Sequence, residues 1–394
     1  MEIGDRIARR YRPENGPGVL REHRALNPAA HVDQPIGNEQ AVERLLDRLD
    51  PIFHGETPTN SYVWGPKGSG KSALVATLFG ELNRLNRHSR SGIHTTTRIA
   101  DSTTTEFAYV DARDVHSEFA LCRAILSAIV EESVPNQGVG IDHLRSLLDE
   151  NFASPTRRGV VAIDHVGEAG TYPLSTVDEF LGGVSASVAR MGIGRLPPKK
   201  LVAEPGATVE FEPYDPHLMI DIVSSRASVG LARNALDHGE LRRIAEWADG
   251  DAHDALAAVF GAAVVASDVG DEHIDSAAIT TGIEAVPRPC AATGSVLSLP
   301  TNRQRVLRRL IELDSDEYGS VQSVATAVAD SIALSATTVE RFLYELADSG
   351  VVRRASGEPT NGPGRPPSRL EPRFPTLVFR RLFDLRAGHG SNRQ

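Results

Sequence analysis

GPKGSGKS, residues 65–72, is the stretch that decides the fold of this chain. It matches the pattern G-x-x-x-x-G-K-[ST], follows the apolar run 62–64 and precedes a helix-like run, SALVATLFGELNRL. A strand, a glycine-rich turn and a helix N-terminus form the setting in which backbone N–H groups wrap phosphates. Lys71 is expected to reach the β- and γ-phosphates and the Ser72 hydroxyl to bind Mg²⁺. We predict a nucleoside triphosphate site made by Gly65, Pro66, Lys67, Gly68, Ser69, Gly70, Lys71 and Ser72.

The composition is acidic and almost free of lysine. Of 42 basic residues only Lys67, Lys71, Lys199 and Lys200 are lysines, and 52 acidic residues bring the net charge to −10. This balance is typical of a halophile or of a very GC-rich genome. The longest apolar run, 255–266, falls short of the ~20 residues that span a bilayer, and the N-terminal residues lack the apolar core of a secretory signal. We therefore predict a cytoplasmic protein without a membrane partner.

The chain is expected to contain three domains. Segments over 61–212 alternate between strand and helix patterns, which predicts a parallel sheet flanked by helices. Ala-rich segments over 214–286 have no convincing strand pattern and predict a small helical domain. The predicted boundaries are a nucleotide-binding domain over 1–212 with an N-terminal arm over 1–34, a helical domain over 213–290, a third domain over 296–386 and a tail over 387–394.

The third domain has the pattern of a winged helix-turn-helix. Apolar residues spaced as on one face of a helix recur over 306–311, 321–328 and 339–346. Ser335 is the expected N-cap of the third helix, and Gly350 is the glycine expected just past its end. Residues 351–355 and 376–383 are expected to pair as the two strands of the wing, across a Gly- and Pro-rich loop. An unspecific helical tail is the alternative.

These segments together resemble the AAA+ ATPases, and specifically the archaeal replication initiators of the origin-recognition/cell-division-control type. Residues 50–75 resemble that family's approach to the phosphate loop, 107–125 its next strand and helix, 209–227 its passage into the helical lid, and GDAHDAL (250–256) its lid signature. The resemblance covers roughly residues 30–385. It implies an α/β fold, an AAA+ P-loop domain with a parallel sheet and helical lid, followed by a winged helix-turn-helix domain. The implied cofactors are ATP and Mg²⁺, and the implied partners are double-stranded DNA, further copies of the chain and a replicative helicase.

The resemblance also marks departures at the positions that support hydrolysis. Asp164 in the motif VVAID should hold Mg²⁺, but the next residue is His165 where the family has a water-polarising glutamate. Glu168 is the nearby candidate to substitute for it.

Three further support positions differ. Arg195 stands where the family has a sensor asparagine, Lys199 falls near the intersubunit arginine finger, and His253 replaces the arginine of the lid sensor. An arginine finger alone contributes ~10³–10⁵ in turnover. We expect ATP binding with weak or no hydrolysis, which is the behaviour of a switch.

Positive charge concentrates at the C-terminal end, where residues 351–394 contain nine arginines against three acids. Clustered arginine is the footprint of phosphate contact, and the Gly-Arg-Pro run around Arg365 resembles a minor-groove hook. A Pro/Gly linker and a solvated polar face remain the alternatives. The candidate DNA-contacting residues are Ser335, Thr337, Thr338 and Arg341 in the third helix, and Arg353, Arg354, Arg365 and Arg369 around the wing.

Three functions compete at this point. The leading hypothesis is an ATP-dependent, DNA-binding protein similar to a replication initiator. A nucleotide-gated regulator of transcription or plasmid maintenance on the same scaffold explains the altered positions equally well. An active AAA+ remodelling enzyme is the third, and turnover above ~1 per second, the low end of typical enzyme rates, would favour it.

Overall fold

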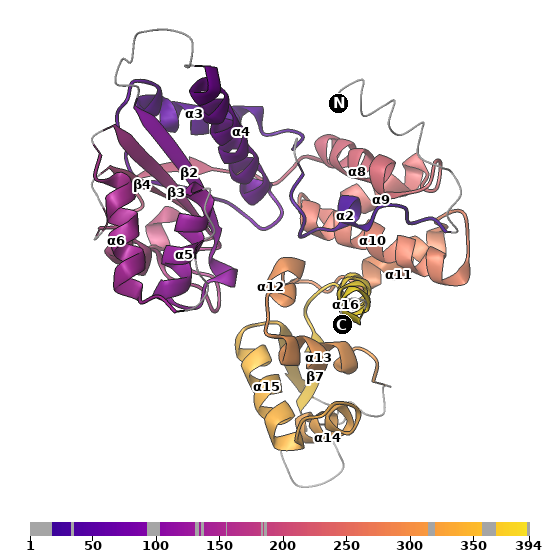
Figure 1. Cartoon of the computed structure of the whole chain (residues 1–394). Helices are drawn as coiled ribbons and strands as arrows, with labels where there is room; N and C mark the ends of the chain where they lie inside the picture. Colours follow the sequence, from indigo (N-terminus) through magenta and orange to yellow (C-terminus); the bar gives the residue numbers. More distant parts are fainter. Residues whose placement is uncertain are drawn as a thin grey trace. The chain divides into compact units, whose positions relative to one another are not determined.

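The computed structural model describes residues 18–32, 35–92, 103–130, 134, 138–154, 156–182, 184, 187–313, 320–356 and 368–391. The chain forms two compact units (Figure 1). The sheet unit is His31–Pro213, and the helical unit combines Met1–Ala30 with Tyr214–Gln394.

A parallel five-stranded sheet forms the centre of the sheet unit, with the strand order β2-β3-β4-β1-β5. Its strands are β1 (Ser61–Trp64), β2 (Thr104–Asp111), β3 (Arg157–Asp164), β4 (Val188–Gly194) and β5 (Ala207–Glu210). β2 ends at Asp111, where the chain turns into the short 3₁₀ helix η2 (Ala112–Asp114). In the β2–β3 register, Tyr109 lies beside Ala162 and Asp111 beside Asp164. This register brings the carboxyl ends of β2 and β3 to one edge of the sheet.

Helices cover both faces of this sheet, as the alternating sequence pattern predicted (Figure 1). α3 (Glu39–Phe53) and α4 (Lys71–Gly92) share one apolar cluster with strand residues such as Val63 and Ile193. α5 (Glu118–Ile129), α6 (Ile141–Phe152) and α7 (Leu174–Gly182) share the opposite cluster with residues such as Val161. The alternation of side chains along each strand thus supplies two buried faces.

The edge strand β2 is closed by amide side chains from α4. Asn83 accepts a hydrogen bond from the Phe107 N–H at 3.1 Å and donates to the Phe107 carbonyl at 2.8 Å. Asn86 donates to the Thr105 carbonyl at 2.7 Å. An edge strand otherwise presents unpaired backbone groups that invite pairing with another chain. α4 therefore satisfies part of the edge that the sheet leaves open.

The helical unit contains the lid and the first described residues of the chain. The lid helices are α8 (Pro216–Gly230), α9 (His238–Ala248), α10 (Ala252–Val269) and α11 (Ser276–Glu284). Among the described residues, α10 is the one helix long and apolar enough to cross a membrane, and 72% of it is buried inside the protein. It contacts α8, α9 and α11, so its apolar length is accounted for by packing.

The N-terminal arm packs differently from the expectation that grouped it with the nucleotide-binding domain. The Val19 carbonyl accepts from the Ala232 N–H at 2.7 Å, and the Gly230 carbonyl accepts from the Arg21 N–H at 2.8 Å. The short helix α2 (His23–Leu26) follows, and the partly buried Arg226 guanidinium donates to the Asn27 carbonyl at 2.8 Å. Residues 18–30 therefore belong to the helical unit.

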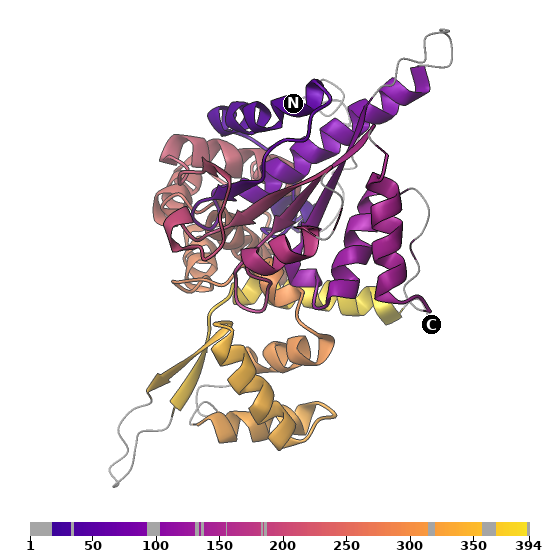
Figure 2. The same cartoon turned by 90° about the vertical axis from the view of Figure 1, so that its left-hand side faces the viewer.

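The third domain consists of three helices and an antiparallel two-stranded ribbon, the arrangement of a winged helix-turn-helix. Its elements are α13 (Thr301–Leu310), α14 (Val321–Ser331), α15 (Ala336–Asp348), β6 (Val352–Ser356) and β7 (Ser368–Pro372). Ser335 caps α15, and Gly350 follows its end with φ of 74°, as predicted. Figure 2 shows the ribbon beside α15, which β6 contacts.

The predicted pairing of residues 376–383 as the second wing strand is wrong. That strand is β7, and residues 376–391 form a helix, α16 (Thr376–Ser391). Val378, Phe379 and Leu382 are its buried residues, a spacing that belongs to one face of a helix. The apolar residues of this segment fit both the spacing of a helix face and the alternation of a strand, so the sequence pattern alone does not distinguish the two structures.

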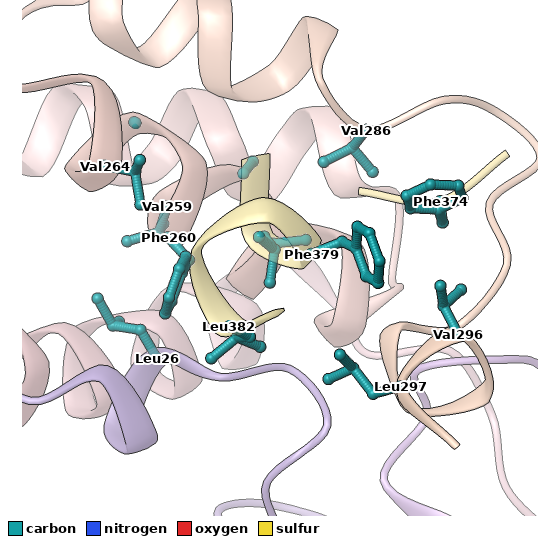
Figure 3. Close-up of a cluster of buried hydrophobic side chains, with 14 of the residues drawn as sticks. Leu26, Val259, Phe260, Val264, Val286, Val296, Leu297, Phe374, Phe379 and Leu382 are labelled. Atoms are coloured by element: carbon teal, nitrogen blue, oxygen red, sulfur yellow. The ribbon is translucent and has the colours of Figure 1, made fainter. Parts of the chain in front are cut away.

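α16 joins the lid to the third domain. It contacts α10, α12 (Thr293–Leu297) and α13, and its Phe379 and Leu382 lie in the same apolar cluster as Phe260 of α10 and Leu297 of α12 (Figure 3). Arg380 pairs with Asp268 of α10 at 2.8 Å. The lid and the winged helix therefore share one continuous core.

We expect Asn83→Ala to loosen the edge of the sheet. The substitution leaves the Phe107 N–H and carbonyl without their side-chain partner, which costs ~1–3 kcal/mol for a buried group. Amide hydrogen exchange at Phe107 should accelerate by about tenfold or more, since 1.4 kcal/mol is tenfold in an equilibrium. Arg84→Ala is the control, because Arg84 is an exposed neighbour paired only locally with Glu81. Unchanged exchange in Asn83→Ala would show that the amide does not close the edge.

Candidate functional site

The phosphate loop, residues 65–72, connects β1 to the start of α4. Gly65 has φ of 153°, and a Cβ there would lie 2.3 Å from the Phe211 carbonyl oxygen. Gly68 and Gly70 have φ of 73° and 84°, in the left-handed region that favours glycine. Glycine is thus required at position 65 because the Phe211 carbonyl leaves no room for a Cβ. It is favoured at positions 68 and 70 because their backbone is in the left-handed region.

Lys71 is buried inside this loop and is the first residue of α4. Its Nζ donates to the Gly65 carbonyl at 2.9 Å, to the Pro66 carbonyl at 2.6 Å and to the Ser69 Oγ at 3.1 Å. These bonds hold the ammonium group among the loop carbonyls, next to the helix N-terminus where the backbone N–H groups favour an anion. Ser72 follows on the same first turn.

Asp164 is the last residue of β3 and is 1% exposed. Its Oδ1 accepts a hydrogen bond from the His165 backbone N–H at 2.7 Å. Its Oδ2 accepts from the hydroxyl of Tyr109, which comes from the neighbouring strand β2. Each carboxylate oxygen offers about two lone pairs, so one donor on each leaves acceptor capacity for a metal ion or its water. Asp164 and the Ser72 hydroxyl are hard oxygen donors, which fit Mg²⁺.

His165 begins the loop after β3 in an unusual backbone conformation, with φ of 60°. A non-glycine residue at positive φ is uncommon, although histidine is among those enriched there. Its Nδ1 lies 3.1 Å from Glu168 Oε1, and its Nε2 lies 3.5 Å from Asp164 Oδ2. The imidazole is therefore held between two carboxylates.

Glu168 links this histidine to the end of β4. Arg195 Nε lies 2.8 Å from the same Glu168 Oε1 that His165 approaches. Burial acts to raise the pKa of Glu168, but the hydrogen bond with His165 and the charge of Arg195 outweigh it and hold that pKa below its ordinary value. His165, Glu168 and Arg195, predicted separately, thus form one connected group beside Asp164.

Three residues of the same edge were missed in the sequence. Tyr109 contacts Asp164 directly, and Asp111 and Arg113 form an ion pair in which Arg113 Nε lies 2.9 Å from Asp111 Oδ1. Burial is the largest influence on the pKa of Asp111, yet the hydrogen bond from Arg113 keeps it below its ordinary value. The available signal was the spacing in FAYVDARD, which puts Tyr109 and Asp111 on one face of a strand.

Comparisons with known proteins relate the chain as a whole to AAA+ proteins. Residues 34–191 match the family model for the AAA ATPase domain. The chain is 24% identical over 346 residues to an ORC1-type DNA replication protein of Thermococcus onnurineus, which covers 81% of this chain and 80% of that protein. Among solved structures, the Aeropyrum pernix ORC1 protein in complex with DNA has a TM-score of 0.60 at 19% identity, covering 93% and 97% of the two chains. The Aeropyrum pernix ORC2 protein in ADPNP–ADP complexes has a TM-score of 0.52 at 15% identity, covering 95% and 100%.

The chain is thus similar to ORC1-type DNA replication proteins over most of its length, and its residues 34–191 match the AAA ATPase domain model.

Two of the support positions expected in an ORC1-type AAA+ protein lie outside the group around Asp164. Lys199 is exposed on a short 3₁₀ turn, η3 (Pro198–Lys200). His253 is buried at the start of α10, in the helical unit.

The ring nitrogens of His253 are both engaged within the helical unit. Its Nε2 accepts from the Thr293 backbone N–H at 2.8 Å, and its Nδ1 lies 3.0 Å from Asp254 Oδ1. Cys290 lies close enough for these three side chains to form a metal-ligand set. Because Nε2 accepts a hydrogen bond, the proton of a neutral His253 ring is on Nδ1, which can donate it to Asp254. A hydrogen bond therefore explains this contact better than a shared metal ion does.

The predicted DNA-contacting residues of α15 lie at its N-terminal end. Ser335 Oγ accepts from the Thr338 N–H at 3.2 Å, so that hydroxyl serves the helix cap. Thr337 and Arg341 are exposed, and Arg341 Nε lies 3.7 Å from Glu345 Oε1. Such an exposed pair contributes only ~0–1 kcal/mol, so Arg341 can exchange it for a phosphate.

The wing arginines lie on the ribbon. Arg353 on β6 pairs with Glu371 on β7, with Nε 3.1 Å from Oε2. Arg354 is exposed and stacks over the Tyr344 ring, 5.1 Å from its centroid. Arg369 is exposed on β7, while Arg365 lies outside the described residues.

We expect Glu168→Gln to destabilise the protein in a pH-dependent way. Because the folded-state pKa of Glu168 is below its ordinary value of 4.5, the stabilisation by the charged group is complete above that pH and is lost as the pH falls through the folded value. Thermal unfolding at pH 7 should show a loss of about 1.5–3 kcal/mol, the range for hydrogen bonds to charged groups. The difference from wild type should shrink steadily below pH 4.5.

The control is Glu179→Gln, which changes an exposed carboxyl of α7 in the same unit. If Glu168→Gln destabilised the protein equally at pH 7 and well below pH 4.5, packing, and not the charge of Glu168, would explain the effect.

Proposed function

We propose that this protein binds ATP with Mg²⁺ and duplex DNA, and that it acts as a replication-initiator-like switch with weak or no ATP hydrolysis. The observation that carries the proposal is the contrast within one site. The phosphate loop and Asp164 retain the arrangement expected for nucleotide binding, whereas the position that activates water is a histidine tied to Glu168. Binding and release of nucleotide then control the protein more than turnover does.

The slow hydrolysis follows from the partners of His165 and Glu168. A general base must be within reach of the attacking water and must have acceptor capacity to take its proton. Glu168 is bound by His165 at 3.1 Å and by Arg195 at 2.8 Å, which stabilise its charged form and lower its basicity. Both ring nitrogens of His165 already face a carboxylate, Nδ1 at 3.1 Å from Glu168 and Nε2 at 3.5 Å from Asp164. The two groups are therefore engaged with each other and with Arg195, and this arrangement does not favour proton transfer from water.

Duplex DNA as a partner is supported by the winged helix-turn-helix and its arginines. α15 offers the exposed Thr337 and Arg341 to base edges, while Arg354 and Arg369 on the ribbon suit phosphates or the minor groove. The similar Aeropyrum pernix ORC1 protein was solved in complex with DNA. A cytoplasmic location follows from this choice of partner.

Self-association is a further part of the proposal. Lys199 is exposed beside two exposed apolar residues, Leu196 at 40% and Val202 at 100%. A cation flanked by apolar side chains suits the edge of a protein interface, and a lysine there supplies charge without the planar fork of an arginine.

We expect Lys71→Ala to weaken ATP binding by about 100-fold. Charge-assisted hydrogen bonds contribute ~1.5–3 kcal/mol each, and each 1.4 kcal/mol is tenfold in affinity. Equilibrium binding of a fluorescent ATP analogue measures the effect, with circular dichroism to verify folding. Lys200→Ala is the matched control, an exposed lysine on η3. ATP binding at the wild-type level in Lys71→Ala would refute the proposed nucleotide site. Separately, ATP turnover by the wild-type protein above ~1 per second would favour the hypothesis of an active remodelling enzyme.

We expect the double substitution Arg354→Ala and Arg369→Ala to lower the salt dependence of duplex binding. Each lost phosphate contact reduces the slope of log affinity against log salt by about 1, so the double variant should lose about 2. Titration of a short mixed-sequence duplex at several salt concentrations measures the slope. The double substitution Arg233→Ala and Arg242→Ala, at two exposed arginines of the lid, is the charge-matched control. An unchanged slope would remove the ribbon from the DNA-binding surface.

A further inference from the structure

Tyr109 lies outside every nucleotide-binding motif of the sequence, yet it touches the residue that those motifs assign to Mg²⁺. It sits on β2 beside Ala162 of β3, two residues before the end of its strand. Asp164 lies two residues after Ala162, on the same face of the sheet, within reach of a long aromatic side chain from the neighbouring strand. The Tyr109 hydroxyl donates to Asp164 Oδ2.

The Tyr109 hydroxyl is held against Asp164 by the position of its ring as well as by the hydrogen bond itself. The ring itself is held in place by an edge-on contact with His31, with centroids 5.9 Å apart and planes at 83°. Tyr109 therefore presents a fixed donor to Asp164.

Two donors from two different elements fix the orientation of the Asp164 carboxylate. The His165 N–H holds Oδ1 from the loop after β3, and the Tyr109 hydroxyl holds Oδ2 from β2. With both oxygens held, the carboxylate cannot rotate without losing a hydrogen bond in a buried site. Hydrogen bonds to a metal-binding carboxylate are known to tune metal affinity by ~10–100-fold.

We propose that Tyr109 is a positioning residue that sets the Mg²⁺ affinity of the nucleotide complex by orienting Asp164. This inference rests on the proposed ATP site and adds to it a residue that acts only through Asp164. The Tyr109 hydroxyl has no part in holding the phosphates, so its removal should leave the binding of metal-free ATP intact.

The test is the substitution Tyr109→Phe, which removes the hydroxyl and keeps the ring. ATP binding is titrated with Mg²⁺ and, separately, in excess EDTA. We expect the Mg²⁺ concentration for half-maximal effect to rise by about 10-fold or more, with the affinity in EDTA unchanged. Tyr62→Phe is the matched control, because Tyr62 is a buried tyrosine of β1 whose hydroxyl donates to the Leu196 carbonyl at 3.0 Å.

A double-substitution cycle with Asp164→Asn separates positioning from a general structural effect. If Tyr109 acts through Asp164, then Tyr109→Phe has no further effect on Mg²⁺ affinity in the Asp164→Asn protein. An unchanged Mg²⁺ response in Tyr109→Phe, an equal loss with and without Mg²⁺, or additive effects in the cycle would each overturn the inference. Failure of the wild-type protein to bind ATP at all would instead overturn the proposed function, and the two failures are therefore distinct.

Discussion

The parallel pairing of β2 with β3, in which Asp111 lies beside Asp164, is the constraint on which the site depends. This register places Tyr109 on the same face of the sheet as Asp164, close enough for its hydroxyl to donate to that carboxylate. A shift of one residue would turn Tyr109 and Asp111 to the opposite face of the sheet. The packing of both faces opposes such a shift, because it would also move the apolar residues that alternate with them into the opposite cluster, where they do not fit. The core thus fixes the register, and the register fixes the chemistry at the carboxyl end of the sheet.

Charge balance at this end of the sheet suits an anionic ligand. Uncompensated carboxylates near a triphosphate would repel it strongly in a buried site. Asp111 is paired with Arg113, and Glu168 with Arg195, so those two carboxylates are neutralised by neighbouring guanidinium groups. Asp164 accepts hydrogen bonds from two neutral donors, the His165 N–H and the Tyr109 hydroxyl. The charged side chains around it are thus largely paired with one another.

Local patterns in the sequence predicted the phosphate loop, the flanked parallel sheet and the helices of the third domain, because these depend on glycine positions, apolar period and caps. Contacts between distant segments were not predictable in this way. The association of residues 18–30 with α8 depends on backbone bonds such as that from Arg21 to Gly230. The segment 376–383 was misassigned because its apolar residues fit both a strand and a helix. Tyr109 was missed because its importance depends on strand register, which no motif encodes.

The helical unit has a continuous core of its own, which joins the lid to the third domain. α16 packs on α10 of the lid and on α12 and α13 of the winged helix, and the apolar cluster they share includes Val339 and Leu343 of α15. His253 of α10 accepts a hydrogen bond from Thr293, the first residue of α12. A displacement of α10 must therefore carry α12 and α15 with it, since separating them would break a close-packed core. His253 and Thr293 thus add a hydrogen bond to the apolar core that joins α10 to the helices of the third domain, so these elements of the helical unit form one packed body.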